Sequence, residues 1–171
     1  EENGAYWTPT ASPIRESSAY RARHGAGYTI FEHNSHGIDQ EMTVFVPIDE
    51  DGGEPIKLQR LVLKNESDRP RTLSVTHYLE WTLGENRETS QMHVTTSWDQ
   101  GVGALLAHNR YHPEYGDRVA FAATTPVSQS YSADRTVFVG RNRSLSHPAA
   151  MERAGLSSRI GAGLDPCAAL Q

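Results

Sequence analysis

The chain has little cysteine, no long apolar run and no excess of basic residues. Its single cysteine, Cys167, has no partner for an internal disulfide bond, which fits a reducing compartment. No stretch approaches the roughly 18 apolar residues of a membrane helix, and no charged-then-apolar leader precedes the first strand pattern. The formal net charge of -5 argues against binding nucleic acid through a basic surface. These absences predict a cytoplasmic domain that contacts neither membrane nor nucleic acid.

Common catalytic and metal-binding signatures are also missing. The sequence contains no Gly-x-Ser-x-Gly turn, no phosphate-binding Gly-rich loop followed by Lys and Ser or Thr, and no His-Glu-x-x-His. Of the 8 histidines, His24, His33 and His36 are close together, but His33 and His36 flank a turn. Structural zinc usually takes four ligands in a closed geometry. We therefore expect no metal and no cofactor in this chain.

Acidic residues on strand patterns leave a hydrolytic alternative open. Sugar-cleaving enzymes use two carboxylates, and four acidic residues lie near predicted strands: Glu32, Asp39, Glu41 and Glu80. With 21 acidic residues in the chain, such positions arise by chance. A solvated strand residue is the simpler interpretation, so no catalytic residue is expected.

What is present indicates a single all-β domain over residues 1–171. The 37% hydrophobic and 22% charged content suffices for one core in a chain of this length. Short β-branched and aromatic runs alternate with Gly, Pro, Asn and Asp clusters at intervals of roughly ten residues. We predict strands over residues 28–33, 38–46, 56–64, 72–83, 93–98, 104–108, 119–123 and 136–139. This pattern predicts an antiparallel β-sandwich with at most one short helix, over residues 148–154, and loop from Ser157 onward.

Turn signals and alternation add detail to this prediction. Residues 34–37, Asn-Ser-His-Gly, and the acidic residues 49–53 are typical of hairpin connections. In the run from Leu73 to Trp81, one face is apolar apart from a histidine, and we expect it to point into the core. Its members are Leu73, Val75, His77, Leu79 and Trp81.

A basic stretch precedes the first predicted strand. Arg21, Arg23 and His24 come just before Gly25 and Gly27, and glycine allows positive φ, so we expect a glycine-punctuated loop. Isolated basic residues of this kind commonly pair with carboxylates of the same fold. The residues assigned here as scaffold or interface groups are Arg21, Arg23, His24 and Tyr28.

A run of polar residues, Glu85 to Gln91, follows a strongly apolar strand pattern. Polar loops on a rigid sheet commonly carry function. Sugar binding needs planar polar groups for the hydroxyls and aromatic faces for the apolar side of the ring. The aromatic candidates, most of them expected in the core, are Trp7, Tyr20, Tyr28, Tyr78, Trp81, Trp98 and Tyr111.

Several short motifs occur in a fixed order along the chain. They are Trp7-Thr8-Pro9-Thr10, Arg23-His24-Gly25-Ala26-Gly27-Tyr28-Thr29, Phe45-Val46-Pro47, Asn65-Glu66-Ser67, Glu80-Trp81-Thr82-Leu83 and Phe138-Val139-Gly140. This ordered set resembles the N-terminal β-sandwich region of the inverting sugar phosphorylases, glycoside hydrolase family 94, formerly glycosyltransferase family 36. Residues 32–38 and 161–171 resemble more closely the phosphorylase-like part of cyclic β-1,2-glucan synthases. The resemblance covers nearly the whole chain.

The resemblance implies a fragment of a larger multidomain enzyme, as does a first residue that is not methionine. In that family a large super-sandwich precedes a helical linker and an (α/α)₆ barrel, which carries the aspartate general acid and binds inorganic phosphate, the co-substrate of inverting phosphorolysis. The implied partners are a glucan or gluco-oligosaccharide, the barrel of the same polypeptide and a second subunit of a homodimer. Other segments of the parent could anchor it to the inner membrane. The isolated chain is expected to be non-catalytic.

The resemblance also implies a sugar contact. Family members extend a sandwich loop toward the partner's active site, and residues 85–92 correspond to that loop, with Gln91 matching a sugar-contacting glutamine. Met92 stands where cellobiose phosphorylases carry arginine, which argues against cellobiose specificity. The candidate sugar-binding residues are Glu85, Asn86, Arg87 and Gln91. Two alternatives remain: a purely structural and oligomerisation module without sugar affinity, and a self-sufficient hydrolase or metal enzyme with clustered carboxylates or histidines.

Overall fold

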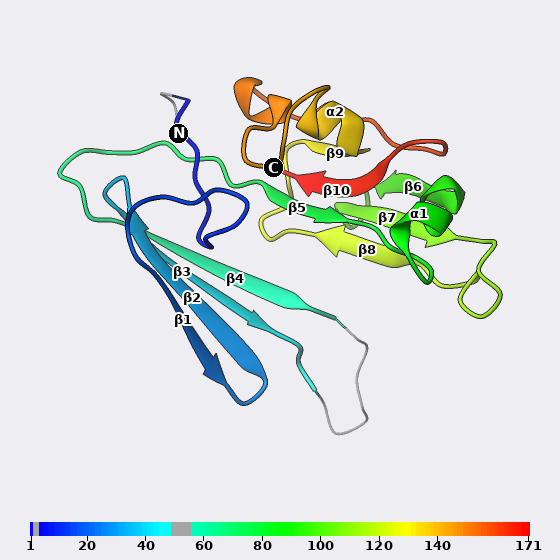
Figure 1. Ribbon diagram of the computed structural model, residues 1–171, viewed down its shortest axis with the longest axis horizontal. Coiled ribbons are helices and arrows are strands. Elements are labelled where there is room, and N and C mark those ends of the chain that lie inside the picture. Colours follow the sequence, from blue (N-terminus) through cyan, green and yellow to red (C-terminus); the bar gives the residue numbers. More distant parts are fainter. Residues whose placement is uncertain (2–3, 49–55) are drawn as a thin grey trace. The chain divides into compact units, whose positions relative to one another are not determined.

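A computed structural model describes residues 1, 4–48 and 56–171 of the chain (Figure 1). The chain forms two compact units, Glu1–Leu73 and Ser74–Gln171, which are described separately. Most of the regular structure in the described residues is antiparallel strand, arranged in three sheets, so the all-β fold class is confirmed. The assignment of residues 1–171 to a single sandwich domain stays a prediction.

The first unit contains a four-stranded meander in the order β1-β2-β3-β4. Its strands are β1 (Tyr20–Gly25), β2 (Tyr28–Ser35), β3 (Ile38–Phe45) and β4 (Leu58–Asn65). Ser35 pairs with Ile38, so His36 and Gly37 form a two-residue turn. Both have positive φ, 54° and 73°, as the favoured hairpin turn requires. The predicted hairpin is thereby confirmed, whereas the predicted turn over residues 49–53 lies outside the described residues.

The basic stretch before Gly25 is a strand, so the predicted loop is wrong. β1 pairs antiparallel with β2, and Arg21 lies opposite Glu32. The guanidinium of Arg23 donates to the Glu32 carboxylate at 2.8 Å, and the His24 ring contacts the Thr29 hydroxyl at 3.0 Å. Cross-strand pairs of this kind stabilise an antiparallel ladder and are invisible until the partner strand is known.

The second unit packs two three-stranded sheets face to face. One has the order β5-β10-β9, with β5 (His77–Glu80), β10 (Pro166–Leu170) and β9 (Tyr131–Asp134); the other is β6-β7-β8, with β6 (Val94–Asp99), β7 (Ala104–Asn109) and β8 (Ala120–Ala123). Side chains from both sheets form one buried cluster: Trp81, Val94, Leu105, Ala107, Ala122, Ala133, Ala168 and Leu170. This sandwich core holds the elements that carry the candidate site.

The central strand β10 is buried on both faces. Its opposite face packs against α2 (Arg135–Val139) and the 3₁₀ turn η2 (Ala149–Glu152) through Ala169, Phe138 and Ala150. Burial raises the pKa of the Cys167 thiol to about 12, so this cysteine is an inert packing residue. The prediction of loop after Ser157 is wrong for β10. This strand is covered on both faces, so its small residues do not show the alternation of polar and apolar residues that marks a half-exposed strand.

The helices also depart from the prediction. The described residues contain two short α-helices, α1 (Arg87–Ser90) and α2, besides two 3₁₀ turns, where at most one short helix was expected. Residues 136–139, predicted as a strand, lie in α2 because the Asp134 carboxylate accepts the Thr136 N–H at 2.9 Å and caps the helix. The helix predicted over 148–154 is the turn η2. Of the helices in the described ranges, none has the length and apolar content needed to cross a bilayer.

The apolar face expected in residues 73–81 is partly confirmed. Leu79 and Trp81 contribute to the sandwich core as predicted. Tyr78, expected on the other face, packs on Phe138 with ring centroids 4.6 Å apart, since α2 covers that side of the sheet. Val75 is wrongly assigned to the core, because β5 begins only at His77 and Val75 is exposed.

Candidate functional site

The polar segment from Glu85 to Met92 is a capped helical turn. Asn86 is the N-cap of α1, and its side-chain oxygen accepts the Thr89 N–H at 2.9 Å. The Ser90 hydroxyl donates back to the Asn86 carbonyl at 2.6 Å. The 3₁₀ turn η1 (Gln91–His93) follows directly and leads into β6. A four-residue helix is marginal alone, so its caps and tertiary contacts hold it.

Arg87 ties this turn to the sandwich core. Its guanidinium donates to the main-chain carbonyls of Trp81 at 3.1 Å and Pro166 at 3.0 Å. It also pairs with the carboxylates of Asp165 and Glu80. Both carboxylates contact a second guanidinium as well, that of Arg135. The geometry therefore makes Arg87 an anchor between α1 and strands β5 and β10.

The Glu80 carboxylate is held ionised within this network. Partial burial acts to raise its pKa, but hydrogen bonds donated by Arg135 and Tyr78 outweigh that effect and lower the pKa below its ordinary value. Glu80, weighed from the sequence as half of a catalytic pair, is thus a structural ion-pair partner. A general acid would instead need a raised pKa.

The remaining candidates of the turn face solvent to different degrees. Glu85 and Asn86 are exposed, and Gln91 is half-buried. The backbone N–H of Gln91 donates to the Arg87 carbonyl at the end of α1. The side-chain amide of Gln91 has no hydrogen-bond partner among the described residues. The turn therefore brings together the three sequence-predicted groups Glu85, Asn86 and Gln91, with one amide available to a ligand.

One of the seven aromatic candidates, most of which were expected in the core, is exposed beside this turn. The ring of Tyr111, in the connection from β7 to β8, lies 5.0 Å from that of His93, which ends η1. The side chain of Tyr111 is 79% exposed. Its position depends on the β6-β7 register, which the sequence does not display.

The scaffold candidates lie in the first unit, on the β1-β2 hairpin. Arg21 and Arg23 both approach Glu32, at 4.0 Å and 2.8 Å. Tyr28 packs over Gly25, where an added Cβ would lie 2.3 Å from the tyrosine ring. Glu32 lies opposite Glu41 in the ladder, and the Arg23 guanidinium is also 4.0 Å from the Glu41 carboxylate. Its positive charge therefore reduces the repulsion between these two carboxylates. These contacts are of the kind that a scaffold role requires.

Two of the histidines that could suggest a metal converge on a carboxylate instead. The Glu16 carboxylate accepts hydrogen bonds from His33 at 2.9 Å, His36 at 2.7 Å and the Ser35 hydroxyl at 2.5 Å. Trp7 stacks on His36 with ring centroids 4.5 Å apart. In the described part of the chain, no group of histidine, cysteine and acidic residues could hold a metal ion. We call Glu16, His33, Ser35 and His36 the Glu16 cluster.

The Glu16 cluster predicts acid sensitivity of the first unit. Burial acts to raise the pKa of Glu16, but the hydrogen bonds donated by Ser35, His33 and His36 outweigh it and lower the pKa. A carboxylate with a lowered folded pKa stabilises above its ordinary value of 4.5 and loses that contribution as pH falls through the folded pKa. We expect about 1.5–3 kcal/mol of stability to be lost in this range.

Urea unfolding between neutral pH and strongly acidic pH, followed by the NMR signal of the Trp7 indole N–H, measures this loss. The variant Glu16→Gln should be less stable at neutral pH and show a flatter pH profile. Glu114→Gln, a change at an exposed acid of the second unit, is the control. Parallel pH profiles for Glu16→Gln and the unsubstituted chain would contradict the assignment.

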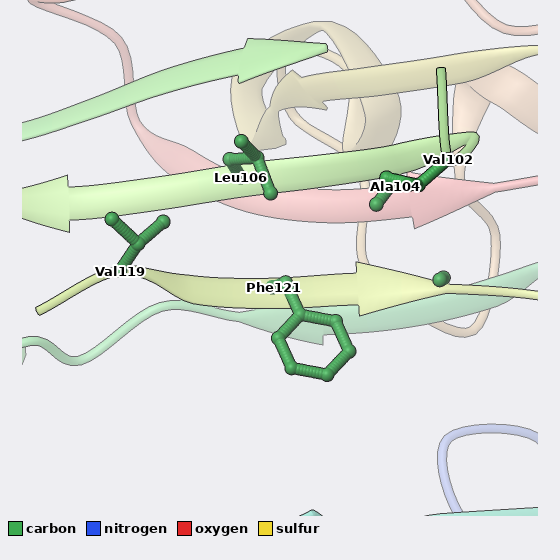
Figure 2. A pocket seen from close by; sticks show the side chains of 6 residues that line it. Val102, Ala104, Leu106, Val119 and Phe121 are labelled. Carbon is green, nitrogen blue, oxygen red and sulfur yellow. The ribbon is translucent and has the colours of Figure 1, made fainter. Parts of the chain in front are cut away.

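A shallow apolar groove lies on the β6-β7-β8 sheet, with a volume of about 410 Å³ (Figure 2). Figure 2 shows Leu106 on β7 and Phe121 on β8, with Val119 just before β8. Its lining residues are Val102, Ala104, Leu106, Val119, Phe121 and Ala123. None of these side chains can donate or accept a proton, so the groove does not provide the carboxylates or histidines that the hydrolase alternative requires.

Similarity to known proteins extends over the whole of this chain. The family model described as glycosyl hydrolase 94, supersandwich domain, matches residues 1–171. A cyclic beta-(1,2)-glucan synthase, NdvB from Rhizobium meliloti, is 36% identical over 98% of this chain and 6% of that protein. An N,N'-diacetylchitobiose phosphorylase from Vibrio proteolyticus is 27% identical over 99% of this chain and 22% of that protein. A solabiose phosphorylase from Paenibacillus borealis is also 27% identical, over the same shares. The chain thus spans less than a quarter of each of these relatives.

Proposed function

The chain belongs to the glycosyl hydrolase 94 family as a supersandwich domain, and from this membership we propose that it is the non-catalytic, carbohydrate-associated domain of a larger sugar phosphorylase or glucan synthase. In this proposal it shapes the sugar site of the parent enzyme, and the catalytic groups lie in another domain of the same polypeptide. The substrate is a glucan or gluco-oligosaccharide, and the parent is a homodimer.

The observation that carries the proposal is the anchored turn formed by α1 and η1. Arg87 fixes the turn to β5 and β10, so polar groups are presented on a rigid support, as recognition of a sugar requires. The side-chain amide of Gln91, which has no hydrogen-bond partner in the described part of the chain, can both donate to and accept from hydroxyl groups. Exposed Glu85 and Asn86 flank it. Arg87 acts here by positioning the turn.

The names of the relatives support a proposal for the parent's chemistry. Several are named phosphorylases, so we propose inorganic phosphate as the parent's co-substrate. Phosphate attack with inversion needs a general acid with a raised pKa. The pKa of Glu80 is lowered instead. Because the proposal assigns the general acid to another domain, we expect the isolated chain to release no sugar phosphate from a disaccharide.

A second candidate function, a structural module without sugar affinity, is favoured by the apolar groove. Val119 and Phe121 are both about half exposed although apolar. Exposed apolar patches commonly mark contacts with other proteins or domains. This candidate predicts no saccharide binding at the turn, which separates it from the first.

The proposal predicts that Gln91→Ala weakens saccharide binding by roughly three- to tenfold, the loss of one or two neutral hydrogen bonds. Calorimetry or NMR titration of the chain with a β-1,2-linked glucose disaccharide, and separately with N,N'-diacetylchitobiose, measures this change. Gln100→Ala removes an exposed glutamine after β6 and serves as the matched control. Equal affinities for the Gln91 and Gln100 variants would overturn the assignment of Gln91.

A further inference from the structure

Tyr111 is an exposed aromatic residue at the edge of the proposed sugar site. Val94, the first residue of β6, pairs with Asn109, the last residue of β7. The residues just before β6 therefore lie beside those just after β7, and Figure 1 shows α1 at this end of the two strands. The ring contact between His93 and Tyr111, at 5.0 Å and 46°, joins the α1-η1 turn to the β7-β8 connection.

The backbone that carries Tyr111 is fixed by a buried amide. Asn109 is only 7% exposed, and its side chain bridges the two segments. The amide nitrogen donates to the Leu83 carbonyl at 2.9 Å, and the amide oxygen accepts the Tyr111 N–H at 3.0 Å. One side chain thus ties Tyr111 to the segment between β5 and α1.

The rest of the connection is equally constrained. His112 accepts the N–H groups of Glu114 at 3.2 Å and Tyr115 at 3.0 Å through Nδ1. A Cβ at Gly116 would lie 2.8 Å from the His112 carbonyl oxygen, so the chain closes there in a way that only glycine permits. The contacts of this loop therefore fix its backbone and leave the Tyr111 ring in solvent.

Tyr115, in the same loop, differs from Tyr111 in the number of groups that contact its ring. Tyr115 has the His112 ring at 5.0 Å and the Arg118 guanidinium over its face at 5.2 Å. Its ring is thus engaged within the loop. For Tyr111, the described residues provide one ring contact, the tilted one with His93, and most of its surface is open.

We propose that Tyr111 is a stacking platform for a pyranose ring of the saccharide whose hydroxyls Gln91 contacts. The apolar C–H face of a sugar packs on an aromatic ring, while planar amides bind the hydroxyls at its edge. His93, whose ring contacts Tyr111, is two residues from Gln91 in the same turn η1, so the amide and the aromatic ring belong to neighbouring segments. This inference rests on the proposed function and adds the aromatic half of the site.

Binding of a β-1,2-linked glucose disaccharide to the 171-residue chain tests the platform. Tyr111→Ala should weaken binding about tenfold, the upper range for one aromatic contact. Tyr111→Phe keeps the ring and should stay within about twofold of the unsubstituted chain, and Tyr115→Ala should match it. NMR should show upfield shifts of sugar C–H protons and saturation transfer from the Tyr111 ring, both absent in Tyr111→Ala. Thermal unfolding confirms that the variants fold.

The outcomes separate this inference from the proposed function. If Gln91→Ala weakens binding and Tyr111→Ala does not, the proposed function stands and the platform is overturned. If Tyr111→Ala alone weakens binding, the platform stands and the role of Gln91 is overturned. An equal loss in Tyr111→Phe would overturn stacking in favour of a hydroxyl contact. No binding by any form at millimolar saccharide overturns both.

Discussion

Leu170→Ala is expected to lower the free energy of unfolding of the Ser74–Gln171 unit by about 2–5 kcal/mol. Leu170 is 1% exposed and belongs to the buried cluster between the two sheets, together with Trp81, Val94 and Leu105. Its strand is hydrogen-bonded to β5 on one side and β9 on the other. Because a central strand cannot shift to fill the space, the truncation leaves a cavity rather than a relaxed core.

Urea unfolding followed by tryptophan fluorescence measures this effect. The chain has 3 tryptophans, and in a Trp7→Phe background the signal comes from Trp81, which belongs to the core cluster, and from Trp98, which packs against it. Val119→Ala is the control, because that side chain is 54% exposed and its truncation should change stability by about 0.5 kcal/mol or less. Similar unfolding midpoints for Leu170→Ala and Val119→Ala would show that the two sheets do not share a core.

Arg87→Ala is expected to lower the stability of the same unit by about 1.5–3 kcal/mol. The change removes the donor for the Trp81 and Pro166 carbonyls and leaves Asp165 and Glu80 with Arg135 as their remaining guanidinium. Arg87→Lys should recover only part of the loss, since an ammonium group lacks the planar fork that reaches several acceptors at once. Saccharide affinity should fall as well, because α1 loses its anchor.

The same fluorescence assay and saccharide titration, run on each variant, distinguish an anchor from a direct contact. For an anchor, stability and affinity fall together, and Arg87→Lys is intermediate in both. Arg141→Ala, a change at an exposed arginine after α2, should alter neither. A large loss of affinity in Arg87→Ala with unchanged stability would instead make Arg87 a sugar-binding residue.

Local patterns predicted the parts of the fold that depend on local chemistry. The β2-β3 hairpin was recognisable because alternation on both sides met a His-Gly turn with positive φ. β10 was missed because Cys167, Ala168 and Ala169 are small, weak strand formers, selected by burial on both faces. α2 was mistaken for a strand because its β-branched residues favour a strand in the sequence pattern. The helix cap that Asp134 provides is seen only in the structure.

The candidate site was likewise predictable only where neighbouring residues define it. A polar run after an apolar strand located residues 85–91, and the resemblance singled out Gln91. The anchoring role of Arg87 was not predictable, because its partner Asp165 is 78 positions away and reaches it only through the pairing of β10 with β5. Composition alone did not separate Tyr111 from the aromatic residues of the core, whereas the β6-β7 register leaves it at an exposed edge.

The most direct test of the carbohydrate-associated role is an NMR titration of the ¹⁵N-labelled chain with a β-1,2-linked glucose disaccharide at millimolar concentration. The account predicts shifts that concentrate at the amide groups of Gln91, His93 and Tyr111, with the side-chain amide of Gln91 among the largest. Absence of any shift, or shifts confined to the apolar groove around Val119 and Phe121, would contradict it.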